Sequence, residues 1–173
     1  FTTERVALVS GDDQYTAGNT VINIMPAVAS ATLASVTLAE WAAGTMIQCA
    51  TEEFSMSTEA ATASRKKICD KVATQRPGER TYVASDTVIV ASSPQAANTL
   101  VDGLALDAIK YVAVRPGLAD STAAAASQKV WIDKRQVLAV DPEPITTEEG
   151  NAYAWRIKWL VLGRNLGAAL TAS

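Results

Sequence analysis

YAWRIKWLV, residues 153–161, alternates large apolar side chains with charged or smaller ones. Side chains of a β-strand point to opposite faces with a period of two residues, so this pattern predicts a strand. The face expected in a core carries Tyr153, Trp155, Ile157, Trp159 and Val161. The other face carries two bases, Arg156 and Lys158, with Ala154 and Leu160. This second face must meet water, a partner chain or a polar molecule that passes by.

The composition predicts one folded domain. The chain has 173 residues, of which 49% are hydrophobic and 19% charged, which is typical of a soluble globular protein with a substantial core. No uninterrupted apolar stretch reaches the roughly 18 residues that a membrane-spanning helix needs. We also expect no signal peptide, because the start lacks a basic segment followed by an apolar one.

Histidine is absent from the sequence, which removes the usual general base and the commonest metal ligand. The two cysteines, Cys49 and Cys69, are too far apart in sequence for a CxxC motif and too few for a zinc site. We expect two buried thiols in a reducing compartment rather than a disulfide, although the residues could pair if their strands lie side by side.

Charge is distributed unevenly along the chain, whose net charge is −3. Residues 1–58 carry a net charge of −5, and residues 59–80 carry +3. A nucleic-acid-binding protein needs a broad basic surface, and this chain offers one short basic segment. The commoner interpretation is a solvated loop, and the sharper one is an acidic N-terminal part that contacts the basic segment of a neighbouring copy.

Further strands are expected from β-prone or alternating runs. Their ranges are 4–9, 20–24, 45–57, 67–73, 80–91, 109–117 and 129–140, with a Pro–Gly turn at Pro77 and Gly78. Residues 10–19 and 118–128 are predicted loops. The Ala-rich segment 27–44 is ambiguous: it holds a short helix from Leu38 to Ala43 stopped by Gly44, or it is an irregular arm that lies on another surface.

One longer helix is predicted at about 93–107. Ser93 can cap its first amides, and Pro94 suits the first helical position. An apolar stripe follows at helical spacing, formed by Ala97, Leu100, Val101 and Leu104. Gly103 costs this helix about 1 kcal/mol relative to alanine, so packing must stabilise it.

Together these elements predict a mainly β fold, an antiparallel β-sandwich or barrel with one packed α-helix and extended inter-subunit arms. The chain is expected to form a single domain, 1–173. Within it, 1–44 would form N-terminal strands and an arm, 45–164 the β-sandwich core, and 165–173 a C-terminal tail.

Three stretches carry a family resemblance: QRPGERTYVASDTVIV, SSPQAANTLVDGLALDAIKYVAVRPG and KVWIDKRQVLAVDPEPITTEEGNAYAWRIKWLVLGR. Their order, with a strand ended by Pro–Gly after the helix, resembles the major tail tube proteins of tailed bacteriophages. The resemblance implies hexameric rings stacked into a hollow tube, whose lumen DNA crosses without specific binding. It also implies a place in the virion tail, assembly in the host cytoplasm, and contact with tape measure and terminator proteins.

No catalytic, cofactor-binding or metal-binding residue is predicted. Candidate inter-subunit contacts are Asp12, Asp13, Glu40, Trp41, Arg65, Lys66, Lys67, Arg156 and Lys158. Two alternative classes stay open. One is another structural module, such as a tail terminator, a capsid decoration protein or the tube of a contractile injection machine. The other is an enzyme with a carboxylate pair, although Glu52 and Glu53 would point to opposite faces of a strand and Glu148 and Glu149 suit a solvated turn.

Overall fold

The structure is a computed structural model, and it describes residues 19–65, 74–91, 101–147 and 150–172. The chain is mainly β, as the sequence predicted. The described elements are β1 (Thr20–Met25), β2 (Ser35–Thr37), α2 (Leu38–Ala42), β3 (Thr45–Met46), the 3₁₀-helix η1 (Gln48–Ala50), β4 (Thr51–Glu53), β5 (Ser57–Arg65), β6 (Thr74–Val83), β7 (Thr87–Ala91), β8 (Ile109–Pro116), β9 (Lys129–Thr147) and β10 (Gly150–Thr171).

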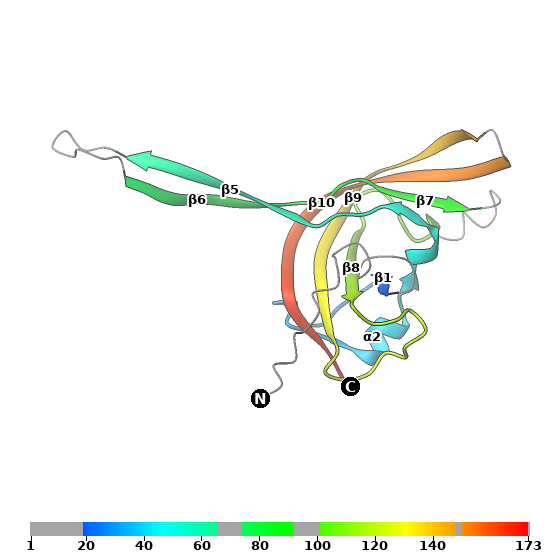
Figure 1. Ribbon diagram of the computed structural model, residues 1–173, viewed down its shortest axis with the longest axis horizontal. Helices are drawn as coiled ribbons and strands as arrows, with labels where there is room; N and C mark the ends of the chain where they lie inside the picture. Colours follow the sequence, from blue (N-terminus) through cyan, green and yellow to red (C-terminus); the bar gives the residue numbers. More distant parts are fainter. Residues whose placement is uncertain (1–18, 66–73, 92–100, 148–149, 173) are drawn as a thin grey trace, which may run out of the picture.

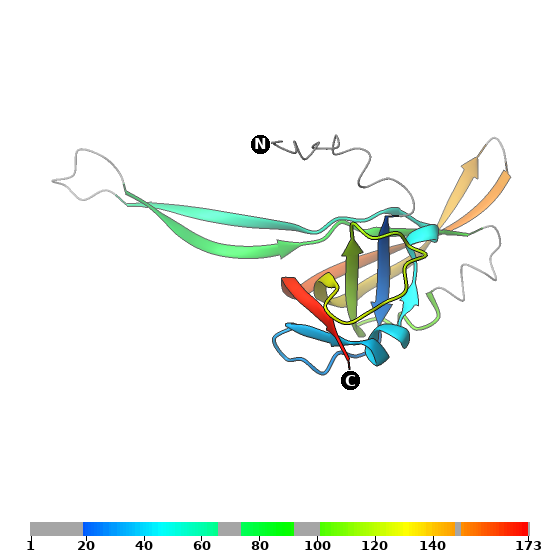
Figure 2. The same cartoon turned by 60° about the horizontal axis from the view of Figure 1, so that its bottom comes forward.

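Most strands form one curled sheet, in the order β3-β1-β8-β9-β10-β7-β4 (Figure 1). These pairs are antiparallel, whereas β2 joins the end of β10 in parallel. The other two strands, β5 and β6, form a separate hairpin that extends away from the body (Figures 1 and 2). The far ends of β9 and β10 project on the opposite side (Figure 1).

The sheet packs a hydrophobic cluster on each of its faces, because successive side chains alternate. On β1, Val21 and Met25 enter one cluster, and Ile22 and Ile24 enter the other. The first cluster is completed by Val28, Leu33, Val36, Trp41, Ala113, Val130, Ile132, Ala168 and Leu170. The second is completed by Ile47, Ile89, Leu104, Val112, Val114, Val137, Ile157 and Trp159. One central sheet therefore supports two cores, one on each face.

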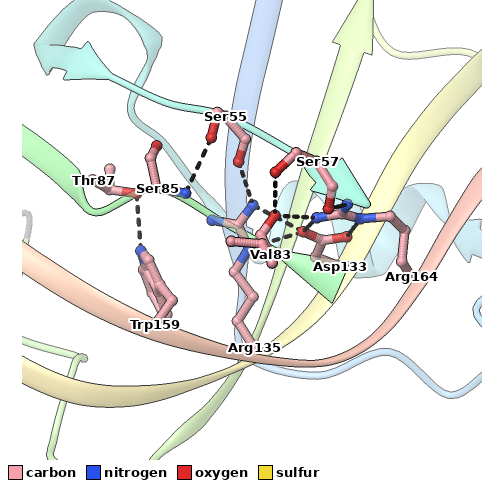
Figure 3. Close-up of polar contacts among 9 residues, drawn as sticks. All are labelled: Ser55, Ser57, Val83, Ser85, Thr87, Asp133, Arg135, Trp159 and Arg164. Atoms are coloured by element: carbon pink, nitrogen blue, oxygen red, sulfur yellow. Dashed lines mark hydrogen bonds and ion pairs between the residues drawn. The ribbon is translucent and has the colours of Figure 1, made fainter. Parts of the chain in front are cut away.

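The opening stretch follows the predicted alternation in its second half. Ile157 and Trp159 are buried, whereas Lys158 and Leu160 are exposed. The indole Nε1 of Trp159 donates to Thr87 Oγ1 on β7 at 2.9 Å, which satisfies its buried N–H (Figure 3). The expected C-terminal tail is wrong as an element: β10 continues to Thr171, because residues 168 and 170 are apolar and enter the first cluster.

The Ala-rich segment 27–44 packs on its own subunit. The predicted short helix is confirmed as α2, where Thr37 caps the amide of Glu40 and Glu40 accepts from the amide of Thr37. A side chain at Gly44 would meet the buried Asn23, since an added Cβ would lie 2.0 Å from Asn23 Oδ1. The helix of this segment, α2, is five residues long.

The prediction of one strand over 45–57 is wrong. The chain forms β3, turns through η1 and continues as β4, and β5 begins only at Ser57. The side chain of Ile47 is 1% exposed and packs in the second cluster. This tertiary contact bends the backbone in a segment whose alternating sequence alone would favour a continuous strand. Cys49, expected to be a buried thiol, is exposed on η1, and Cys69 lies outside the described residues.

The turn predicted at Pro77 and Gly78 is wrong, and the strand expected at 67–73 lies outside the described residues. Residues 57–65 and 74–83 pair as β5 and β6, and Pro77 and Gly78 lie inside β6 instead of forming a turn. Pro77 is tolerated because it lies in an exposed two-stranded hairpin, next to a register shift between Ala60 and Thr62. Residues 66–73 are not described.

Three further boundaries differ from the sequence prediction. The expected strand at 80–91 is divided between β6 and β7, and β9 runs through the expected stop at 141–144 to Thr147. Val101 is helical, as predicted, but the helix predicted at 93–107 does not continue beyond it: residues 102–107 form turns and irregular backbone, with Asp107 at a φ of 62°. Residues 92–100 of that helix, like the strand expected at 4–9, lie outside the described part. The strand at 109–117 is confirmed as β8, followed by Gly117 with a φ of 77°.

Candidate assembly interface

The hairpin β5–β6 is the most exposed part of the fold. Residues 57–62 and 77–82 are all exposed, and the hairpin runs out from the body in both views (Figures 1 and 2). Within the described chain, the outer edges of β5 and β6 pair with no other strand. An isolated two-stranded hairpin is marginally stable in water, and its free N–H and C=O groups can pair with another chain. This arm is therefore a candidate for contact with a second molecule.

Three buried charged side chains meet where the arm joins the sheet (Figure 3). Asp133 on β9 accepts hydrogen bonds from Arg164 on β10, at 2.6 Å from Nε and 2.8 Å from Nη2. It also accepts from Arg135 Nε at 3.1 Å and from Arg135 Nη2 at 2.9 Å. All three side chains are at most 2% exposed. Two positive charges thus share one carboxylate out of water.

Arg164 connects this cluster to both strands of the arm. Its Nη1 donates to the carbonyl of Ser57, at the start of β5, and its Nη2 donates to the carbonyl of Val83, at the end of β6, at 3.2 Å. Its guanidinium also lies over the ring of Tyr82, 5.4 Å from the centroid. One side chain therefore contacts the sheet and the two ends of the arm at once.

Arg135 secures the segment that precedes the arm. Its Nη2 donates to the carbonyl of Ser55 at 3.3 Å, and its guanidinium stacks 5.0 Å from the ring centroid of Phe54 and 5.9 Å from that of Trp159. Burial lowers the pKa of Arg135, and the carboxylate of Asp133 opposes this shift. Arg135 Nη1 is buried with no hydrogen-bond partner in the described structure.

A second exposed feature is an apolar face of the sheet. Ile109, Gln136 and Leu160 lie side by side on β8, β9 and β10. Ile109 and Leu160 are 44% and 46% exposed, and nearby Leu138 and Leu162 are exposed to 50% and 46%. We call these four apolar residues the leucine face. Clustered exposed apolar side chains commonly mark a protein–protein contact.

A buried arginine also organises the loop at 118–128. Arg115 donates to the carbonyls of Ala119 and Thr122 and to Gln128 Oε1, over distances of 2.8 to 3.1 Å. Burial lowers the pKa of Arg115. The segment is a loop, as predicted, and these bonds tie it to the end of β8.

The structure separates the residues predicted as inter-subunit contacts. Trp41 is 2% exposed in the first cluster, so it is not available at the surface. Glu40 accepts hydrogen bonds from the amides of Ala29 and Thr37, at 2.6 and 2.8 Å. Lys158 is exposed on β10, and Arg156 pairs with Asp86 at 3.6 Å.

The remaining predicted contacts cannot be placed fully. Arg65 ends β5 on the arm, and its side chain lies outside the described part. Lys66 and Lys67, and Asp12 and Asp13 in the N-terminal segment, are not described. Among these five residues, the described part of the chain contains Arg65 alone, at the outer end of the arm.

The sequence interpretation missed Asp133, Arg135 and Arg164. A signal was present in KVWIDKRQV, since Asp133 and Arg135 have the same parity as the core-facing residues Trp131 and Val137. Charged residues at core positions of a strand need partners there, and they mark a buried polar network.

One of the two acidic pairs considered as catalytic candidates lies in the described part of the chain. Glu52 and Glu53 are on β4, whose pairing with β7 shifts register between Thr51 and Glu53, and Glu148 and Glu149 are not described. Among the described residues, no group of three or more His, Cys, Asp or Glu side chains could hold a metal ion. A search of the same residues finds no helix long and apolar enough to cross a membrane.

A curled sheet, an arm whose outer edges are unpaired among the described strands, and an exposed apolar face are typical of structural subunits that associate with other chains. The sequence profile of the phage tail tube protein family matches residues 11–172, so the chain belongs to that family, and the resemblance found in the sequence is confirmed. It is a structural component of the virion tail.

Two other comparisons add less. A search of curated protein sequences gives no significant match. Among solved structures, the chain is similar to one from a cryo-EM structure of the anti-feeding prophage baseplate, 6-fold symmetrised, with 8% sequence identity and a TM-score of 0.45. The alignment covers 87% of this chain and 93% of the other. A likeness this distant carries no inference about function.

Proposed function

We propose that copies of this chain form hexameric rings that stack into the hollow tail tube through which viral DNA passes. The observation that carries the proposal is the arm of a tail tube family member, which leaves the body as an exposed two-stranded hairpin with both outer edges unpaired in the described chain. Such an edge gains main-chain hydrogen bonds when another strand is added. A neighbouring copy supplies that strand in a homomeric assembly.

The leucine face supports contact with a second copy. Its four side chains lie on the continuous sheet of β8, β9 and β10, and Lys134 and Lys158 flank it. Burying an apolar side chain of this size contributes about 1.5 to 3 kcal/mol. When one patch meets a different patch on the next copy, repeated contacts generate rings and stacks.

The charge of the chain suits a conduit for DNA. A net charge of −3 repels phosphate on average and provides little affinity through counterion release. We therefore propose that DNA crosses the lumen without specific binding. Tape measure and terminator proteins are the other partners that we propose, with assembly in the host cytoplasm and no catalytic step.

Electron microscopy of the purified full-length chain tests this function. We expect rings with a central hole and six-fold symmetry, or tubes built from them, in two-dimensional class averages. Sedimentation of the same sample across a range of concentrations should show large species in place of a monomer. A chain that stays monomeric at high concentration and shows no ring in the images would contradict the proposal.

A further inference from the structure

We propose that Arg164 is a positioning residue that sets the direction of the β5–β6 arm before subunits assemble, and that Asp133 positions Arg164. The proposal rests on the assembly function above, because the orientation of the arm matters only if the arm meets a neighbouring copy.

Side-chain packing contributes little to holding the described part of the arm in place. Its residues are exposed from Ser57 to Thr62 and from Pro77 to Tyr82, so no core contact holds this part in one direction. The strands reach the body through short segments at Ser55 and Ser85, where the amide of Ser85 donates to Ser55 Oγ at 3.1 Å. A hairpin joined in this way can pivot at its root unless further contacts restrain it.

The guanidinium of Arg164 supplies those contacts. It has five N–H donors in a rigid planar fork, so it can bind several acceptors in a defined relative geometry. Here the acceptors are the Asp133 carboxylate and the carbonyls of Ser57 and Val83 (Figure 3). Because these carbonyls belong to different strands of the arm, the arm is restrained against rotation as well as displacement.

Asp133 determines where that fork lies. Its two oxygens receive Nε and Nη2 of Arg164 side by side, which is the bidentate geometry that orients an arginine. Arg135 binds the same carboxylate and also holds Ser55, just before the arm. Asp133 therefore holds both arginines, Arg164 that bonds to the arm and Arg135 that bonds to the segment before it.

An oriented arm lowers the cost of assembly. A flexible arm loses conformational freedom when it pairs with a neighbour, whereas one that is already oriented has little left to lose. This explains why two arginines and an aspartate are buried at this point, although a buried ion pair is often no more stabilising than an apolar replacement.

The test compares Arg164→Lys with the parent protein. Lysine keeps the positive charge beside Asp133, but its single ammonium cannot hold the carboxylate and both strand carbonyls in the arginine geometry. The matched control is Lys110→Arg, the reverse exchange at a partly exposed position on β8 that belongs neither to the arm nor to the leucine face.

The direction of the arm is measured by double electron–electron resonance, which gives the distribution of distances between two spin labels, on dilute, unassembled full-length chain. The background carries Cys49→Ser and Cys69→Ser. Spin labels at Thr62→Cys on the arm and Lys129→Cys on the body then measure the arm–body distance. Labels at Thr45→Cys and Lys129→Cys report the body alone. Residues 45, 62 and 129 are all exposed.

In the parent and in Lys110→Arg, the arm–body distance distribution should be as narrow as the body–body distribution. In Arg164→Lys it should widen about twofold or more while the body–body distribution stays unchanged. An arm–body distribution that stays narrow in Arg164→Lys overturns the proposal. If that variant does not fold, the parent decides: a narrow arm–body distribution supports positioning, and a broad one overturns it.

Assembly is then followed by light scattering. Arg164→Lys should form assemblies about tenfold more slowly than Lys110→Arg, because it must order its arm during association. Equal rates, despite a widened arm distribution, would overturn the link to assembly. A parent chain that forms no rings or tubes would refute the proposed function, whereas the arm measurement would stand on its own.

Discussion

Asp133 and Arg164 form a bidentate, buried ion pair between β9 and β10, with Arg164 Nε 2.6 Å from Asp133 Oδ1 and Arg164 Nη2 2.8 Å from Asp133 Oδ2. Their strands pair directly, with Arg164 opposite Asp133 in the ladder. Both side chains are buried, and the buried side chain of Arg135 adds a second positive charge beside Asp133. It is the point where the stability of the body and the geometry of the arm depend on the same atoms.

Replacing Asp133→Asn should destabilise the fold strongly. The change leaves Arg135 and Arg164 buried without a counter-charge, and breaking a buried pair in this way costs about 3–5 kcal/mol. Urea denaturation followed by tryptophan fluorescence measures the loss. The control Asp141→Asn, on the same strand at an exposed position, should change stability by less than about 0.5 kcal/mol. A loss for Asp133→Asn no larger than that of the control would show that the cluster does not stabilise the fold.

Glu40 should make stability depend on pH. Burial alone would raise the pKa of Glu40, but hydrogen bonds from the amides of Thr37 and Ala29, with a further one involving the Thr37 side chain, outweigh burial and lower it. A lowered folded-state pKa contributes stability above the unfolded value, near 4.5, and this contribution disappears as pH falls through the folded value.

Glu40→Ala should therefore cost about 1 kcal/mol at pH 7, since two backbone amides lose their acceptor. The difference in stability between the parent and Glu40→Ala should shrink as the pH is lowered below the unfolded pKa near 4.5. Urea denaturation at pH 7 and at pH 3 measures both values. A difference of the same size at both pH values would show that the ionised carboxylate is not what stabilises α2.

Charge on the leucine face should block association without unfolding the subunit. In Leu160→Lys with Leu162→Lys, both side chains are already about half exposed, so stability should change by less than about 1 kcal/mol. Rings and tubes should be lost in negative-stain images, because two charges would have to be buried against a neighbour. Leu106→Lys is the control, since it places the same charge on an exposed leucine in the turn before β8. Normal tubes in the double variant would exclude this face from the contact.

Reversing the bases at the outer end of the arm should impair assembly. Arg65 ends β5, and Lys66 and Lys67 follow it, whereas the N-terminal segment carries Asp12 and Asp13. If these segments of neighbouring copies meet, replacing all three bases with glutamate converts attraction into repulsion. Tube length by electron microscopy is the measurement, with Asp12→Lys and Asp13→Lys added to restore the opposite signs. Tubes of normal length in the triple variant would reject charge matching.

The period-two pattern of the chain was sufficient to predict strands where one side of the pattern is apolar. The middle of β10 shows this, with Ile157 and Trp159 buried as expected, whereas β1 and β8 were predicted from β-prone runs and are buried on both faces. The short helix α2 was also predictable, since Thr37 and Glu40 form a capping box within four residues and Gly44 ends the turn that follows.

Elements whose conformation depends on distant contacts were predicted poorly. The alternating segment 45–57 is interrupted because Ile47 inserts into the second cluster, and Pro77 with Gly78 lies inside a strand because β5 pairs alongside it. The candidate site was missed for the same reason. Asp133, Arg135 and Arg164 have meaning only when β9 and β10 are paired and the arm root is in place.

The amino-acid sequence by itself determined the β-rich character, the alternation of core and surface side chains, and the family, because these follow from residue type and spacing along the chain. Only the tertiary structure decided that the Ala-rich segment covers its own core, that β5 and β6 pair as an exposed arm, and that Arg164, bound by Asp133, joins this arm to the sheet. The physical reason is that burial and hydrogen bonding at these places depend on residues such as Ser57 and Arg164, which are far apart in sequence and adjacent only in the folded chain.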